Sequence, residues 1–181
     1  RDPGPCLIEN VTVTGFDCGI WVGGSVYGVT FEHITLARQR SAGLRNVNNT
    51  VSVRDLQSVN AVPALLNDGN YGQVVLLDSS LRGGDPAGVA VVNSGVLFAR
   101  QITAEGYRNA IRHVGADVPG LTVDEYVSHP ARSLFPGAQR SLNLPITETP
   151  HYHDNDLNHW ANVERFGARK DDTGDDAIGI Q

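Results

Sequence analysis

Two carboxylates in this sequence are candidates for the acid pair that carbohydrate hydrolysis requires. Asp85 lies in the segment RGGDPA and Glu105 in AEGYRN, two polar loops about one 22-residue period apart. A pair of carboxyl groups about 5–9.5 Å apart can cleave a glycosidic bond, one as general acid and the other as base or nucleophile. The alternative is that both charges form weak, exposed ion pairs with neighbouring arginines such as Arg82.

Several aromatic residues could bind such a substrate, because aromatic rings pack on apolar faces and carry polar edges. The candidate substrate-binding residues are Trp21, Tyr27, Tyr71, Tyr107 and the basic residue Arg108. Half or more of such aromatics could equally pack in the core or at its edge.

The stretch HYHDNDLNH (151–159) has the most metal-like composition. Its candidate ligands are His151, His153, Asp154 and Asp156. Two histidines at i and i+2 with two aspartates could chelate zinc or another divalent ion. However, neither an HExxH motif nor a Cys/His spacing accompanies them, and caps and turns use the same residue types. The sequence therefore predicts no metal site and no cofactor.

Composition limits the partners. The net charge is −6, which argues against nucleic acid because phosphate binding needs a basic face. No apolar run reaches the length of a membrane span, so no membrane partner is predicted. Cys6 and Cys18 could form a disulfide in an exported protein or remain two small buried thiols. Since the 181 residues include no methionine, we expect a processed product or a piece of a longer chain.

The elements that would position these residues form an internal repeat. Five segments align, each starting with an apolar residue and containing an apolar-polar-apolar patch, a polar loop and a second alternating patch. Their first residues are Ile8, Phe31, Val53, Leu76 and Phe98, at spacings of 23, 22, 23 and 22. Valines close each unit at Val29, Val51, Val74 and Val96.

Alternation with period two indicates strands with one buried face. Two or three short strands per unit at a constant repeat predict an all-β fold, a right-handed parallel β-helix of about five coils of 22–23 residues over 1–123. The expected internal aliphatic ladder is Ile20, Leu44, Leu65 or Leu66, Val89 and Ile111. A leucine-rich solenoid lacks its signature here, and a β-sandwich would not hold so even a period.

Two further segments follow the repeat. Residues 124–159 contain prolines and scattered apolar side chains, which predicts an irregular linker packed on the side of the β-helix. Residues 160–181, WANVERFGARKDDTGDDAIGIQ, resemble the strand and cap that open pectate-lyase-like β-helix domains. In that resemblance Asp175 and Asp176 fall in the first turn of the capping helix, where carboxylates satisfy free N–H groups.

A cap motif that follows a finished β-helix resembles the tandem β-helices of glycoside hydrolase family 55. This resemblance implies a secreted or periplasmic enzyme that acts on a β-glucan-like polysaccharide or oligosaccharide. The present residues would form a scaffold and cleft wall, with the catalytic residues in the remainder of the parent chain, so the isolated segment should be inactive. The alternatives are a non-catalytic glycan-binding or adhesion scaffold and a phage tailspike-type β-helix.

Overall fold

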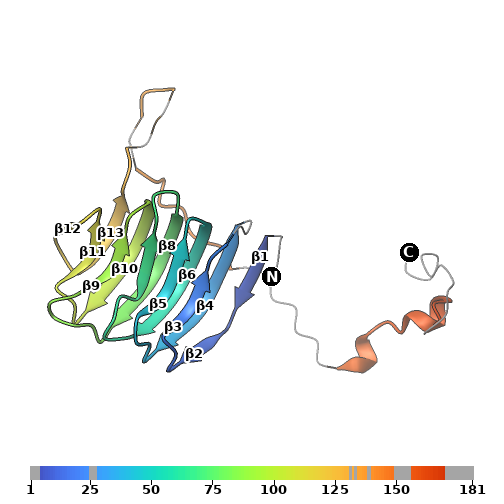
Figure 1. Ribbon diagram of the computed structural model, residues 1–181. Helices are drawn as coiled ribbons and strands as arrows, with labels where there is room; N and C mark the ends of the chain where they lie inside the picture. The colour runs from blue at the N-terminus through green and yellow to red at the C-terminus, as the bar shows by residue number, and fades with distance from the viewer. Residues whose placement is uncertain are drawn as a thin grey trace. The chain divides into compact units, whose positions relative to one another are not determined.

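The protein was analysed as a computed structural model that describes residues 5–24, 28–130, 132, 134–137, 140–148 and 156–169. The chain divides into two units, Arg1–Arg140 and Ser141–Gln181. The first unit is an all-β solenoid of about five turns, built from stacked parallel strands (Figure 1). The predicted all-β parallel β-helix of about five coils is therefore confirmed.

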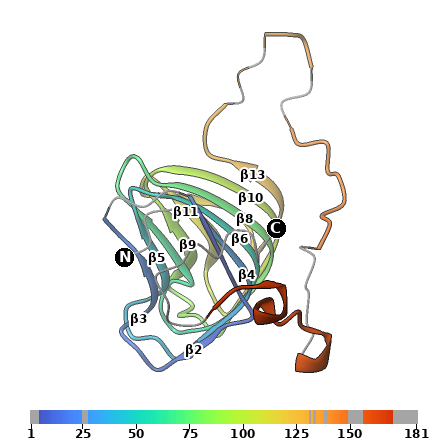
Figure 2. The ribbon, with the colours of Figure 1, turned by 90° about the vertical axis from the view of Figure 1, so that its right-hand side faces the viewer.

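Two sheets run along the solenoid. The seven-stranded sheet contains β1 (Cys6–Glu9), β2 (Thr12–Thr14), β4 (Val29–Ala37), β6 (Thr50–Val59), β8 (Gln73–Arg82), β10 (Val96–Glu105) and β13 (Thr122–Val127). The six-stranded sheet contains β3 (Cys18–Val22), β5 (Ala42–Val47), β7 (Leu65–Asp68), β9 (Val89–Asn93), β11 (Asn109–His113) and β12 (Ala116–Val118). The chain alternates between the two sheets, so each coil contributes at least one strand to each sheet (Figure 2).

The long strands of the seven-stranded sheet bend at one position in every coil. There the backbone has a positive φ in a residue other than glycine, and the strand register aligns these residues. This bend row consists of Asn10, His33, Asp55, Asp78 and Gln101, with φ of 58°, 53°, 51°, 49° and 55°. Asparagine and aspartate tolerate this left-handed conformation better than most residues. The bend lets one strand continue around a corner of the coil.

The core is made of aliphatic side chains stacked coil on coil. In the seven-stranded sheet, Phe31 pairs with Val53 and Val53 with Leu76, and all three are buried. In the six-stranded sheet the ladder is Ile20, Leu44, Leu65, Val91 and Ile111. Burial of these apolar surfaces along the whole stack is the main stabilising term of the solenoid.

The predicted ladder was wrong at one coil. Val91, not Val89, pairs with Leu65 and Ile111. The polar loop before it is longer in this coil, because nine positions separate Arg82 from Val91 (91 − 82) but six separate Val59 from Leu65 (65 − 59). Val89 is also buried, but it pairs with Asn109.

The start of the fifth repeat was displaced by one residue. Ala99, not Phe98, aligns with Leu76 and is fully buried, and Leu97, not Val96, aligns with Val74. The coil from Leu76 to Ala99 spans 23 residues (99 − 76), one more than predicted. Its longer loop before Val91 is offset by a tight turn between β9 and β10, where four positions separate Asn93 from Leu97 (97 − 93) but seven separate Asn67 from Val74 (74 − 67).

Inside the six-stranded sheet, three buried asparagines form a hydrogen-bonded ladder. Asn46 Nδ2 donates to Asn67 Oδ1 at 2.9 Å, and Asn67 Nδ2 donates to Asn93 Oδ1 at 2.6 Å. Asn93 Nδ2 lies 2.7 Å from His113 Nδ1, which must accept because the amide nitrogen can only donate. Each asparagine also donates to a carbonyl of its own following turn, at Asn49, Gly72 and Gly95. The ladder therefore fixes the turns that lead back to the long strands.

The second unit contains two short 3-10 helices among its described residues, η1 (Leu157–His159) and η2 (Val163–Phe166). Asn162 caps η2 by accepting a hydrogen bond from Glu164 N at 3.0 Å, and Gly167 ends it in the left-handed conformation. The strand expected at the start of 160–181 is not present within 156–169, where this capped helix forms instead. Asp175 and Asp176 lie outside the described residues.

Candidate functional site

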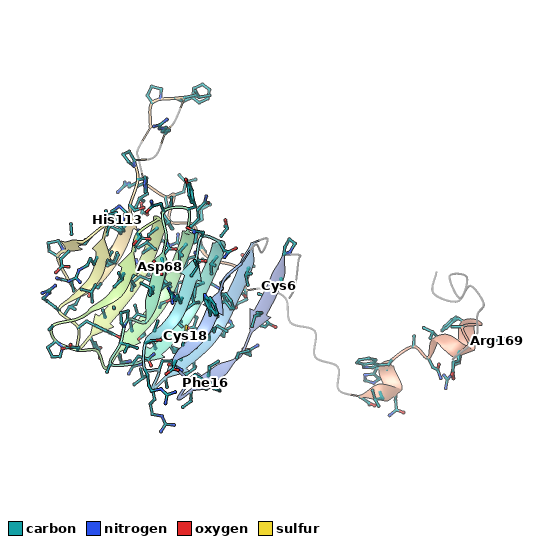
Figure 3. The ribbon with its side chains drawn as sticks, in the orientation of Figure 1. Cys6, Phe16, Cys18, Asp68, His113 and Arg169 are labelled. Carbon is teal, nitrogen blue, oxygen red and sulfur yellow. The ribbon has the colours of Figure 1, made fainter. Side chains whose placement is uncertain are left out.

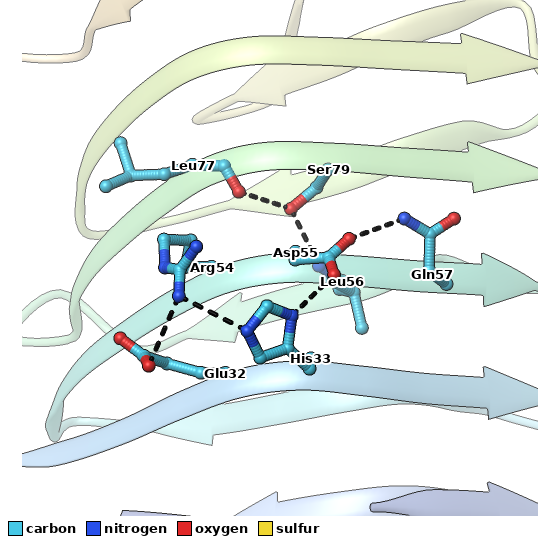
Figure 4. A network of polar contacts seen from close by, with 8 residues as sticks. All are labelled: Glu32, His33, Arg54, Asp55, Leu56, Gln57, Leu77 and Ser79. Atoms are coloured by element: carbon cyan, nitrogen blue, oxygen red, sulfur yellow. Dashed lines mark hydrogen bonds and ion pairs between the residues drawn. The ribbon is translucent and has the colours of Figure 1, made fainter. Parts of the chain in front are cut away.

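A connected network of polar side chains lies at the bend of the long strands (Figure 4). His33 Nδ1 is 2.7 Å from Asp55 Oδ2, and Gln57 Nε2 donates to Asp55 Oδ1 at 2.6 Å. Both oxygens of Asp55 therefore accept hydrogen bonds. The side chains of His33 and Asp55 are each about one-third exposed, so the pair faces the surface.

A buried ion pair supports this cluster from the preceding position of the same strands. Arg54 Nη2 lies 3.3 Å from Glu32 Oε2 and 3.3 Å from His33 Nε2. Because arginine can only donate, His33 Nε2 accepts this bond, and Nδ1 then donates to Asp55. The imidazole is thus held in one orientation by a cation on one side and a carboxylate on the other.

The environment lowers the pKa of Asp55. Burial by itself raises the pKa of this carboxyl group. The hydrogen bonds from His33 and Gln57, together with the nearby positive charge of Arg54, outweigh burial and hold the pKa below its ordinary value of 3.8. Asp55 is therefore ionised at neutral pH.

Polar side chains extend this cluster along the stack. The strand register places Asp78 opposite Asp55 and Gln101 opposite Asp78, at the coil spacing of about 4.8 Å. Two residues further along the strands lies a second aligned row, Thr12, Thr35, Gln57, Ser80 and Thr103. We call the bend row and this second row together the polar face. Every coil contributes two polar side chains to it, which together supply carboxylate, hydroxyl, amide and imidazole groups.

The predicted catalytic pair falls elsewhere, on two different elements. Asp85 lies in the loop between β8 and β9, where its Oδ1 accepts a hydrogen bond from Ala87 N at 2.9 Å and so shapes the loop. Glu105 is the exposed last residue of β10. Its strand neighbour is Arg82, on the coil below.

The predicted aromatic residues do not gather on one surface. Trp21 lies on β3 with 70% of its surface exposed, and Tyr71 is exposed in the turn between β7 and β8. Tyr107 is buried, and its hydroxyl oxygen lies 3.0 Å from Asn60 O and 2.9 Å from Val62 O, so its one hydrogen is shared between the two carbonyls. Tyr107 is therefore a core residue, with its ring inside the protein. Its burial raises the pKa of the phenol to about 12. Tyr27 lies outside the described residues.

The predicted basic residue Arg108 is engaged at the C-terminal end of the solenoid. Its Nη2 lies 2.6 Å from Asp117 Oδ2, and Arg112 Nε lies 2.6 Å from Asp117 Oδ1. The hydrogen bond from Arg112 and the charges of both arginines lower the pKa of Asp117 against the effect of desolvation. Arg108 thus joins β11 and β12 through Asp117.

Asp156, the described member of the metal-like stretch, has a structural role. Its Oδ1 accepts hydrogen bonds from Asn158 N and Nδ2 at 3.0 and 2.7 Å, which caps η1. The candidates His151, His153 and Asp154 lie outside the described residues. Among the residues that the structure does describe, no group of three or more His, Cys, Asp and Glu side chains is placed to hold a metal ion.

The two cysteines lie on different sheets, Cys6 on β1 and Cys18 on β3 (Figure 3). Both are free thiols. Burial raises the pKa of Cys18, whose Sγ donates to Ile20 O at 3.1 Å.

No protein-family model, curated protein or solved structure matches the chain. Its parallel β-solenoid is thus established by the structure alone, and the pectate-lyase-like and family 55 resemblances stay predictions. In the described part of the chain, helices long and apolar enough for a membrane span are absent.

The His33–Asp55 pair is not among the residues predicted from the sequence, because the predicted carboxylates lie in loop segments and this pair lies in the interior of strands β4 and β6. A signal for it does exist in the sequence. A polar residue, usually Asn, Asp or His, recurs between two apolar patches at positions 10, 33, 55, 78 and 101, once per coil. Such a residue inside a strand pattern indicates a left-handed bend.

We expect Asp55→Asn to make the unfolding free energy of the solenoid less dependent on pH in the acidic range. A carboxyl group whose pKa is lowered by folding contributes stability above its ordinary pKa, and that contribution disappears as the pH falls through the folded value. At pH 7 the variant should lose about 1 kcal/mol of unfolding free energy, because partly exposed charged hydrogen bonds are lost. The two proteins should converge as the pH falls through the folded pKa of Asp55, which lies below 3.8.

Urea unfolding at several pH values measures this difference. Asp68→Asn is the matched control, because Asp68 pairs with Arg45 at an exposed site and should matter little at any pH. A constant difference between Asp55→Asn and the parent from pH 7 to pH 2.5 would contradict the assignment.

Proposed function

We propose that this chain binds an extended, neutral polysaccharide along the polar face and forms one wall of the cleft in a polysaccharide-degrading glycoside hydrolase. The observation that carries the proposal is the polar face itself. Its aligned rows repeat hydrogen-bonding groups at each coil, and a polysaccharide repeats its hydroxyl groups along its length. A stacked array can therefore make equivalent hydrogen bonds to successive sugars.

The charges on the polar face support a neutral ligand rather than a polyuronate. Asp55 and Asp78 are neighbours on adjacent coils, and His33 is hydrogen-bonded to Asp55. An anionic polymer would meet like charges, which disfavour association. Neutral sugar hydroxyl groups can instead donate to the carboxylates in charge-assisted hydrogen bonds. A secreted or periplasmic location belongs to the same proposal, since polysaccharides of this kind lie outside the cytoplasm.

A second function, a glycan-binding scaffold without catalysis, is favoured by one observation. Asp55 accepts hydrogen bonds at both oxygens, and Asp85 is used to shape its loop. A carboxylate held this way by its own chain is a poor proton donor or nucleophile at neutral pH. Both functions predict that this chain does not itself hydrolyse the polysaccharide. Incubation of the chain with soluble β-glucan, followed by assay of new reducing ends, tests this. We expect no hydrolysis.

The binding proposal predicts the effect of Asp78→Ala, which removes an exposed carboxylate from the fourth coil of the polar face. Loss of a charge-assisted hydrogen bond of about 1.5 kcal/mol should weaken binding to soluble β-glucan about tenfold. Affinity electrophoresis or calorimetry measures this change, with polygalacturonate as the anionic comparison that should not bind.

Asp68→Ala is the control for this experiment, since it makes the same chemical change on β7 of the other sheet. Its affinity should equal that of the parent. If neither β-glucan nor any other neutral polysaccharide binds, or if both variants lose affinity equally, the polar face is not the binding surface.

A further inference from the structure

β13 extends the polar face beyond the fifth coil. It pairs antiparallel with β10 and places Thr122 opposite Thr103, which belongs to the second row. One residue of each strand, Gln101 on β10 and Asp124 on β13, lies between the residue pairs on either side of the bend. Thr122 therefore continues the second row, and Asp124 continues the bend row beyond Gln101.

The Asp124 side chain lies on the outer side of β13. Val123 and Tyr126 of this strand pack against the core, whereas Asp124 is exposed. Gln101 and Asp78 are also exposed, and Asp78 lies opposite Gln101 on β8. Because neighbouring strands are about 4.8 Å apart, the backbones of Asp78 and Asp124 are separated by about 10 Å, with Gln101 between them.

The side chains of Asp78, Gln101 and Asp124 keep their full hydrogen-bonding capacity. Within the part of the chain that the structure describes, these three side chains form no hydrogen bond or ion pair. The second and third coils differ, because both ring nitrogens of His33 and both carboxylate oxygens of Asp55 are already bonded within the protein (Figure 4). A ligand at His33 and Asp55 must compete with these bonds, whereas a ligand at the other three residues need not.

The chemistry of these three side chains matches a ligand that donates hydroxyl hydrogens. Carboxylates accept hydrogen bonds, and a glutamine amide both donates and accepts them. The hydroxyl groups of a neutral sugar can serve both, and a bond to an ionised carboxylate is about twice as strong as one between neutral groups. An ether oxygen cannot donate, so a sugar whose hydroxyl groups are methylated would lose the bonds to Asp78 and Asp124.

We propose that Asp78, Gln101 and Asp124 form the principal subsite for the polysaccharide, and that this subsite requires sugars with free hydroxyl groups. The subsite lies at the β13 end of the stack. A short oligosaccharide binds there, and a longer chain extends from it along the polar face toward the first coil. This inference deepens the proposed polysaccharide binding and rests on it.

Asp124→Ala tests the subsite. Since the Asp124 side chain has no partner in the described part of the chain, the variant should keep the β-rich circular dichroism spectrum of the parent. Its affinity for soluble β-glucan, measured by calorimetry, should fall about tenfold, as for Asp78→Ala. Because these carboxylates are well separated, the effects should add, and the double variant should lose about a hundredfold. Asp68→Ala, on the other sheet, is the matched control and should keep the affinity of the parent.

The same measurements distinguish a failure of this inference from a failure of the proposed function. If Asp78→Ala weakens binding and Asp124→Ala does not, the polysaccharide binds the polar face without using β13, and only the subsite is wrong. If the parent chain binds no neutral polysaccharide, the subsite and the proposed function are both wrong.

A short β-glucan oligosaccharide gives a readout that needs no variant. In an NMR titration of the isotope-labelled chain, the amide resonances of Gln101 and Asp124 should shift, while those of His33 and Asp55 stay constant. A fully O-methylated form of the same oligosaccharide should bind about tenfold more weakly. Shifts centred on β4 and β6, or equal affinity for the methylated sugar, would overturn the inference.

Discussion

Val91→Asp should abolish folding of the solenoid. Val91 is fully buried between Leu65 and Ile111 in the internal ladder, with aliphatic side chains above and below it. A carboxylate there would have no cation or hydrogen-bond donor in the ladder, and leaving a charge uncompensated in a core costs about 5 kcal/mol. That is comparable with the whole unfolding free energy of an ordinary domain, about 5–15 kcal/mol. Circular dichroism should show loss of the β signal.

Val92→Asp is the control, because Val92 is the next residue on the same strand and points to the outer side, where it is only partly buried. It should fold and lose no more than about 1 kcal/mol in urea unfolding. If both variants fold with equal stability, the register of β9 described above is wrong.

The β-solenoid could be predicted because its stacked coils require two features that are visible in one sequence, inward apolar residues and a constant period. Inward residues must be apolar in every coil, so the alternation around Val53 and Leu76 recurs wherever the chain completes a turn. Parallel stacking then fixes the mean period, because each coil must return to the same place above its neighbour. Both features are local or periodic, and a single sequence shows them.

The register within each coil was less predictable, because loops of different length keep the mean period while shifting individual strands. The loop from 83 to 88 delays β9, and the tight turn after Asn93 advances β10, so the two changes in loop length compensate over one coil. Tyr107 illustrates the same difficulty. Its position in a polar loop segment suggested a surface ring, but the ring lies inside and its hydroxyl group bonds to carbonyls of Asn60 and Val62.

The polar cluster could not be located from loops and motifs because a bend creates it. At a left-handed residue the side-chain alternation of a strand is interrupted, so Arg54 and Asp55 lie on the same side as Glu32 and His33 of the neighbouring coil. A strict period of two would place Arg54 and Asp55 on opposite faces. The juxtaposition of His33 with Asp55 therefore depends on backbone geometry that sequence alternation does not encode.

The asparagine ladder leads to the second large expected effect. Asn67→Val should lower the unfolding free energy by about 3–4 kcal/mol. Asn67 is fully buried, and its amide joins Asn46, Asn93 and the carbonyls of Gly72 and Val96. Valine fits a ladder position, since Val22 occupies that position in the first coil. It would leave several buried groups without a partner, and each costs about 1–3 kcal/mol before relaxation.

Asn46→Val distinguishes the loss of hydrogen bonds within the ladder from the effect of replacing an asparagine side chain by valine on packing alone. In the described part of the chain Asn46 Oδ1 has no hydrogen-bond donor, because Val22 lies where the next asparagine would be. The substitution removes that unsatisfied oxygen together with the two donated bonds to Asn49 O and Asn67 Oδ1. The loss should therefore be smaller, about 1–2 kcal/mol. Urea unfolding of both variants at pH 7 measures the difference. Equal losses would mean that the asparagines act through packing alone, because only a connected ladder makes the central rung cost more than the terminal one.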